Sequence, residues 1–138
     1  MISTKARYAL RVMVDLAEHS DQKYIPLKEI SARQEISEKY LEIILKILVK
    51  GKLVKGLRGK GGGYMLTREP KDYIVGEIIE LTEGPLVCVA CRHPDAADCP
   101  RKGECVTLPL WENFDALVHN YFYSITLEDL INGNIPQN

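Results

Sequence analysis

The chain has 138 residues, enough for one domain with a buried core, and its content of 46% hydrophobic and 27% charged residues is ordinary for a globular protein. The formal net charge of -1 hides an asymmetry, because residues 1–70 hold fourteen Lys/Arg against eight Asp/Glu and residues 71–138 hold four against eleven. A basic first half indicates contact with a polyanion. No apolar run reaches the roughly 18–20 residues of a membrane span, and the first residues lack the apolar core of a secretory signal, so we expect a cytoplasmic protein without a membrane partner.

The first predicted helix begins after Ser3 or Thr4 and runs to about His19. Its buried face is predicted from apolar residues at helical spacing: Ala6, Ala9, Leu10, Met13, Leu16 and Ala17. Basic residues near its start, including Lys5, suit a helix end that lies near phosphate. A solvated basic face is the alternative interpretation.

Two short helices separated by a tight turn are predicted next. Pro26 fixes the entry of the first at a first helical position, and Ser37 is a suitable N-cap for the second. The second helix ends at Gly51, and its buried face is formed by Leu41, Ile44, Leu45 and Leu48. Helix–turn–helix is typical of a DNA reader whose second helix enters the major groove, whereas a plain helical hairpin is the structural alternative.

A two-stranded hairpin is predicted to follow, with Leu53, Val54 and Leu57 in one strand, residues 64–66 in the other, and a glycine-rich tip over residues 58–63. The glycines do not form a nucleotide-binding loop, because no strand–loop–helix order surrounds them and no Gly-Lys-Ser/Thr follows. A wing with a cationic tip fits better and strengthens the DNA-binding interpretation.

The predicted partner is therefore double-stranded DNA with a palindromic operator. Arg58 is expected to enter a narrow minor groove, Lys39, Tyr40 and Lys60 to meet phosphate, and Glu42 either to accept from cytosine N4 or to remain solvated. The full set of predicted DNA-contacting residues is Thr4, Lys5, Lys28, Ser37, Lys39, Tyr40, Glu42, Arg58, Gly59 and Lys60.

Three helices and a tail over residues 133–138 complete the predicted order. A short amphipathic scaffold helix starts at Val75 and ends at Gly84-Pro85, and a longer helix runs from Pro109 to about Ser124. Its predicted seam repeats at steps of three and four: Trp111, Phe114, Val118, Tyr121 and Ile125. So large an apolar stripe in a small chain predicts a homodimer across this helix, with an intramolecular core helix as the alternative. Thr126-x-x-Asp129 predicts the cap of a last short helix.

Four cysteines lie in the aperiodic loop between these helices, in the pattern Cys88-x2-Cys91-x7-Cys99-x5-Cys105. Four thiolates this close along the chain can hold an iron–sulfur cluster or zinc, although zinc sites prefer two tight pairs and only Cys88/Cys91 is one. The cysteines could instead be redox-active or inert thiols. A cysteine-nucleophile enzyme lacks support, since His93 is the only histidine placed as a base, so we expect no enzyme.

The opening Ser-Thr-Lys-x-Arg-Tyr-Ala-Leu, the Ser37-x-x-Tyr40-Leu41-Glu42 of the second short helix and the Arg58-Gly-x-Gly-Gly-Gly-Tyr64 wing resemble the Rrf2 family of bacterial winged-helix repressors. The resemblance covers nearly the whole chain, through Trp111 and residues 125–130. It implies a mainly α fold with a small β-wing. Residues 1–84 would form the winged helix-turn-helix domain, 85–106 a cysteine-rich cluster-binding loop, and 107–138 the dimerisation helix with the last short helix.

In that family three cysteines before the dimer helix hold an iron–sulfur cluster, and Cys91, Cys99 and Cys105 match them. The gap between the first two is seven residues here rather than the usual five, and Leu108 stands where some members carry a ligating histidine. With Cys88 as the expected fourth ligand, and His93 or a partner-subunit residue as the alternate, the resemblance implies a repressor controlled by a 2Fe-2S or 4Fe-4S cluster. The alternative is a cluster-free regulator of cysteine or sulfur metabolism, controlled by a protein partner or metabolite, with zinc-binding or redox cysteines.

Overall fold

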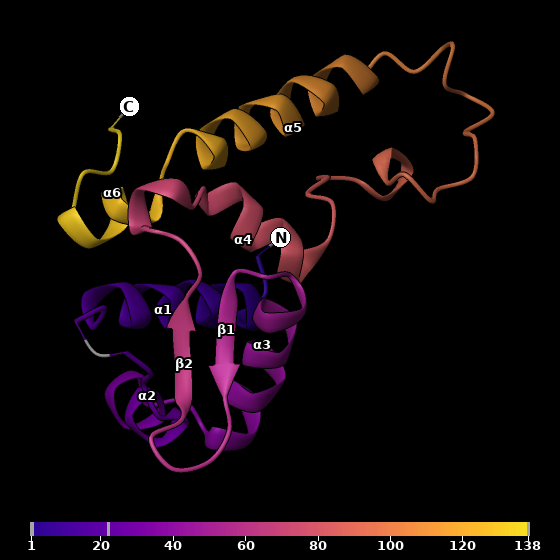
Figure 1. Ribbon diagram of the computed structural model, residues 1–138. Coiled ribbons are helices and arrows are strands. Elements are labelled where there is room, and N and C mark those ends of the chain that lie inside the picture. Colours follow the sequence, from indigo (N-terminus) through magenta and orange to yellow (C-terminus); the bar gives the residue numbers. More distant parts are fainter. Residues whose placement is uncertain (1, 22, 138) are drawn as a thin grey trace.

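The computed structural model describes residues 2–21 and 23–137 (Figure 1). It has α1 (Thr4–Glu18), α2 (Leu27–Gln34), α3 (Glu38–Lys50), β1 (Val54–Leu57), β2 (Gly63–Leu66), η1 (Pro70–Asp72), α4 (Val75–Glu83), η2 (Ala90–Arg92), α5 (Leu108–Tyr123) and α6 (Leu127–Asn132). The two strands pair antiparallel, so the predicted mainly helical class with a small wing is confirmed. Among the described helices, none combines the length and apolar character needed to cross a membrane.

The second helix of the helix–turn–helix, α3, is held by its apolar face. Ser37 caps it by accepting a hydrogen bond from the Tyr40 amide at 3.2 Å, as predicted. The predicted inward residues are all fully buried against α1 and its neighbours: Leu41, Ile44, Leu45 and Leu48. Because a helix that buries one face must present the other, this packing turns the polar side of α3 outward.

A buried carboxylate joins α1 to the end of α2. Asp15, only 1% exposed, accepts hydrogen bonds from Arg33 at 2.8 and 3.0 Å and from Gln34 at 3.0 Å. Glu35 then takes a left-handed φ of 54° and ends the helix, and the Ser31 hydroxyl donates to the Ile36 carbonyl at 2.6 Å. The tight turn that sets the approach of α3 is thus fixed by polar contacts that the apolar pattern does not reveal.

The wing is attached to the body at two places. Ile25 and Tyr64 exchange backbone hydrogen bonds of 2.9 Å, and a Cβ at Gly63 would lie 2.3 Å from the Ile25 carbonyl oxygen, so this approach requires glycine. The buried Tyr73 hydroxyl donates to the Leu53 carbonyl at 2.7 Å and accepts from the Thr67 amide at 2.8 Å. These bonds hold the base of the hairpin against the helices.

The C-terminal elements depart from the prediction at one residue of the seam. Ile125, predicted on the dimer seam, is buried at 3% exposure with Val75 and Ile79, because α5 ends at Tyr123 and the chain turns back into the core. Leu127, in the capped helix α6, joins the main core with the residues of α1. The last helix therefore packs on α1 and η1, whereas the first half of α5 and the cysteine loop extend away from these elements (Figure 1).

Two prolines that were expected at the first position of a helix lie one residue away from that position. Pro26 is the N-cap residue of α2, one position before the first helical residue. Pro109 is the second residue of α5, which begins at Leu108. Both prolines still lie where the missing amide hydrogen costs no helical bond.

The Asp15 network predicts acid sensitivity. Burial alone would raise the pKa of Asp15, but the hydrogen bonds from Arg33 and Gln34 and the Arg33 charge outweigh it and hold that pKa below its usual value. The carboxylate therefore stabilises the fold at pH above its unfolded-state pKa of about 3.9, and this stabilisation is lost as the pH falls through the lower folded-state pKa. We expect Asp15→Asn to lower the free energy of unfolding by about 2 kcal/mol near neutral pH and by less in acid, measured by urea unfolding. Glu18→Gln, on the exposed side of the same helix, should have little effect; equal losses in both variants would contradict the assignment.

Candidate functional site

Helix α3 and its cap carry four of the ten predicted DNA-contacting residues. Lys39 and Glu42 are exposed, and Ser37 is exposed at the cap. Tyr40 is half-buried, and its ring meets the Tyr8 ring edge-on at 5.6 Å. This contact places the start of α3 beside α1, so the Tyr40 ring is fixed in place.

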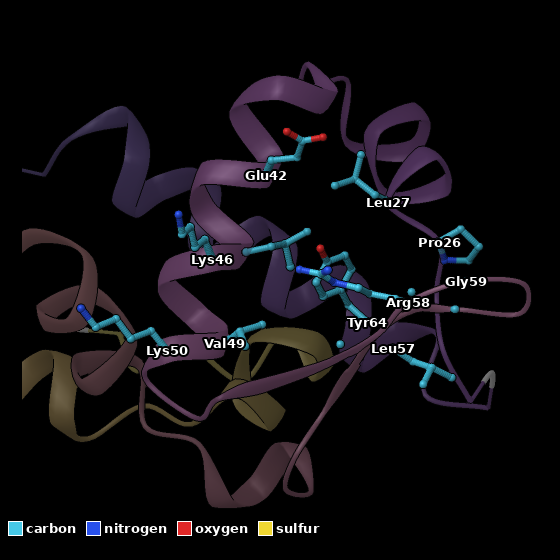
Figure 2. Close-up of a pocket in the computed structure, with 14 residues that line it drawn as sticks. Pro26, Leu27, Glu42, Lys46, Val49, Lys50, Leu57, Arg58, Gly59 and Tyr64 are labelled. Atoms are coloured by element: carbon cyan, nitrogen blue, oxygen red, sulfur yellow. The ribbon is translucent and has the colours of Figure 1, made fainter.

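A groove of about 960 Å³ separates α3 from the wing (Figure 2). Its floor is largely apolar, with Leu45, Val49 and Tyr64, and Glu42 lies on the α3 side. Figure 2 shows Arg58 reaching from the wing into the groove toward α3. The structure thus brings Glu42, Arg58 and Gly59 around one groove, although they come from two distant segments.

Two lysines of this groove were not predicted from the sequence. Lys46 and Lys50 line it from α3, and both are exposed. They follow Lys39 at spacings of seven and eleven residues, which places all three along one line of the helix. That spacing was the available signal, but the predicted contacts on this helix stopped at Glu42.

The remaining predicted residues lie outside the groove. Lys60 is exposed at the wing tip, and Lys28 lies near the start of α2. Thr4 and Lys5 stand in the first turn of α1, where the Thr4 hydroxyl accepts a hydrogen bond from Arg7 at 3.2 Å. Their contacts with DNA stay predictions.

Three of the four cysteines line a second, smaller hollow of about 310 Å³ at the start of α5. Cys91, Cys99 and Cys105 share it with His93, and Cys88 does not line it. All four thiols are free. Across residues 2–21 and 23–137, no three His, Cys, Asp or Glu side chains stand close enough together to hold a metal ion. The chemistry of the hollow nevertheless suits one, because three sulfur donors and an imidazole face the same space.

Cys88 is held instead by a buried acid on α5. The Asp115 carboxylate accepts from the Cys88 amide at 2.9 Å and from Arg92 Nε at 2.8 Å. Burial alone would raise the pKa of Asp115, but the bonds from Arg92 and Cys88 hold it below its usual value. Asp115 was not predicted as a site residue. It lies on the same helical face as the apolar residues at positions 111, 118 and 122, and an acid on that face was the available signal. These contacts tie Cys88, which precedes η2, and Arg92, the last residue of η2, to α5.

The two half-buried thiols differ in acidity. Burial, followed by the hydrogen bond and charge of Asp115, raises the pKa of Cys88. The side-chain and backbone hydrogen bonds of Thr107 lower the pKa of Cys105, whose sulfur lies 3.3 Å from the Thr107 hydroxyl. Cys105 is therefore the more thiolate-like of the pair and the better metal ligand or nucleophile.

An apolar stripe on α5 is open to solvent. Leu110, Phe114 and Leu117 are exposed at steps of four and three, with Leu117 at 69%. Trp111, Val118 and Tyr121 of the predicted seam are half-buried, and Tyr121 packs against the cluster around Ile79. The exposed stripe is therefore rotated toward Leu110 and Leu117, which lie outside the predicted seam.

Comparisons with known proteins agree with this architecture. Residues 2–133 match the model of the Rrf2 family, described as an iron-dependent transcriptional regulator. The HTH-type transcriptional regulator IscR of Vibrio atlanticus is 37% identical over 133 residues, covering 96% of this chain and 76% of the relative. Among solved structures, T. potens IscR superposes with a TM-score of 0.77 at 37% identity, covering 100% of this chain and 93% of the other. The global cysteine regulator CymR of B. subtilis superposes with a TM-score of 0.77 at 36% identity, covering 96% and 97%.

The difference in pKa between Cys105 and Cys88 predicts that the two thiols are alkylated at different rates. Near neutral pH, in protein free of metal and reductant, Cys105 should react with iodoacetamide several-fold faster than Cys88, because its pKa is lowered and that of Cys88 is raised. Thr107→Val removes the hydroxyl and should slow Cys105, while Thr107→Ser keeps it and serves as the matched control. Peptide mass spectrometry over time measures both rates, and an unchanged Cys105 rate in the valine variant would contradict the assigned cause.

Proposed function

Because this chain belongs to the Rrf2 family and is a DNA-binding transcriptional regulator of the IscR and CymR type, we propose that it binds a palindromic operator as a homodimer under the control of an iron–sulfur cluster. The family resemblance seen in the sequence is thereby confirmed, and the regulator is not an enzyme. The dimer, the cluster and the individual contacts are our proposal.

The observation that carries the DNA-binding proposal is the exposed cationic side of α3 with the groove beside it. Lys39, Lys46 and Lys50 form one line along α3, and Lys46 and Lys50 line the groove together with Arg58 of the wing. The ion pairs found within the described residues use other cations, such as Arg33, Arg68 and Arg92, so these four are available to phosphate. A DNA strand passing between a major groove that holds α3 and a minor groove that holds the wing would meet them together.

The homodimer proposal is supported by the unpartnered stripe on α5. Leu110, Phe114 and Leu117 leave water only if a second apolar surface covers them, and a second copy of α5 offers the same residues. Half-buried Trp111 and Val118 of the predicted seam would lie at the edge of this contact. Ile125 has no part in it, because it is buried within one chain.

The cluster proposal is supported by the donor set of the cysteine hollow. Cys91, Cys99 and Cys105 would be ligands, and His93 lines the same hollow, which favours it over Cys88 as the fourth. A bound iron–sulfur cluster would join these three cysteines of the loop through redox-sensitive iron–sulfur bonds. The cysteine loop adjoins α5, and Arg92 and Cys88 of the loop contact Asp115 on that helix. If cluster loading changes how ordered the loop is, the packing of the loop on α5 changes too. In a dimer joined across α5, this would alter the distance between the two α3 helices that contact DNA.

The second candidate is a cluster-free regulator controlled by a partner protein or metabolite, with cysteines that act as redox thiols or bind zinc. It is favoured by the absence, among the described residues, of a group already arranged to hold a metal. The lowered pKa of Cys105 also suits a redox thiol.

DNA binding tests the main proposal through its salt dependence. Arg58→Ala and Lys46→Ala should each weaken binding to operator and to unrelated duplex alike and lower the slope of log affinity against log salt by about 0.9, since each is expected to neutralise one phosphate. Lys71→Ala removes an exposed lysine paired with Glu69 on η1 and is the control. Fluorescence anisotropy over a salt series measures the slopes; slopes equal to wild type in both test variants would exclude the groove as a phosphate site.

Metal loading separates the two candidates. Anaerobically reconstituted protein should be coloured and contain iron and sulfide, and Cys91→Ser, Cys99→Ser and Cys105→Ser should each lose most of both. If His93 is the fourth ligand, Cys88→Ser should retain them while His93→Ala loses them. Absorption spectra with iron and sulfide analysis give the result. A colourless, iron-free wild type would exclude the cluster and leave the DNA-binding regulator in place.

A further inference from the structure

One apolar side chain interrupts the cationic line of α3. Positions 39, 43, 46 and 50 follow one another at steps of four, three and four, so they lie along the outermost strip of the helix, opposite the buried leucines. Three of these positions are lysine and the fourth is Ile43, which is 51% exposed. Ile43 therefore stands near the centre of the surface that we propose to meet DNA.

Packing within the chain does not account for an isoleucine here. The buried face of α3 is complete without it, and Ile43 is absent from both apolar clusters of the described residues. As a β-branched residue it is also a weaker helix former than the lysines beside it. Its side chain is left free to meet whatever approaches the strip.

The chemistry of a base-pair edge limits which DNA group Ile43 can contact. In the major groove the four base pairs show hydrogen-bonding groups and a single apolar one, the 5-methyl group of thymine. An aliphatic side chain cannot donate or accept, so the methyl group is the feature that it can recognise. Glu42, the preceding residue, is exposed and can accept from cytosine N4.

We propose that Ile43 is a specificity-determining residue that selects a thymine through its 5-methyl group, next to a base read by Glu42. The inference rests on the proposed role of α3 as the reading helix. The ligand is thymine within duplex DNA. A protein surface docking on the same isoleucine is the competing occupant, and it would give no dependence on the thymine methyl group.

The test removes the methyl group on the DNA side of the contact and shortens the side chain on the protein side. Duplexes are first selected from a random pool with the wild-type chain, and each thymine of the selected half-site is then replaced by deoxyuridine, which removes only the methyl group. At one thymine, wild type should lose affinity roughly three- to five-fold, the value of one buried methyl group. Ile43→Ala should bind the thymine duplex with a similar loss and be insensitive to that replacement, while Ile43→Val keeps part of the sensitivity.

Val49→Ala is the matched control, because Val49 is also an exposed aliphatic residue of α3 but lies in the groove beside the wing. It should retain the full response to deoxyuridine. If every replacement has the same effect on wild type and Ile43→Ala, the inference is wrong and α3 still reads DNA. If wild type enriches no sequence from the pool, the proposed function fails and the inference fails with it.

Discussion

The burial of one face of α3 is the constraint on which the rest of this structure depends. Four aliphatic residues of that helix lie fully buried against α1, so the opposite face is held outward whatever its composition. The backbone bonds between Ile25 and Tyr64 then fix the wing at a set distance from α3. The groove with Arg58 on one side and Lys46 on the other follows from these two attachments. A regulator needs this rigidity, because base and phosphate contacts must be presented together.

Helix α5 is connected to α4, beside this DNA-reading unit, by specific contacts near its C-terminal end. A Cβ at Gly76 of α4 would lie 2.3 Å from the Tyr123 ring, so α5 crosses α4 closely at that point, and the Tyr123 hydroxyl donates to Glu80 at 3.0 Å. In the middle of α5, Asp115 holds Cys88 and Arg92 at the start of the cysteine loop. One helix thus contacts α4 through one end and the loop through its middle. In the proposed regulator, this is the route by which the state of the thiols reaches the DNA.

Sequence reasoning succeeded where a period or a cap dictates local structure. The buried face of α3, the Ser37 cap and the glycine-dependent wing were all predicted, because helical spacing and backbone sterics determine them. The placement of Ile125 on the dimer seam was wrong. The alternating three- and four-residue spacing of apolar residues continues to Ile125, but α5 ends at Tyr123. Asp15 and Asp115 could not be paired from sequence, because their cationic partners lie 18 and 23 residues away. From the aperiodic cysteine loop, the types of ligand could be predicted, but their arrangement in space could not.

In the proposed regulator, two copies of this chain join across α5 and place two copies of α3 on one duplex. Sedimentation equilibrium of the chain alone and with a selected palindrome tests it most directly. We expect a particle of twice the 15.6 kDa chain mass in free solution, and two chains per duplex in the complex. A chain that stays monomeric and binds one copy per duplex would contradict it.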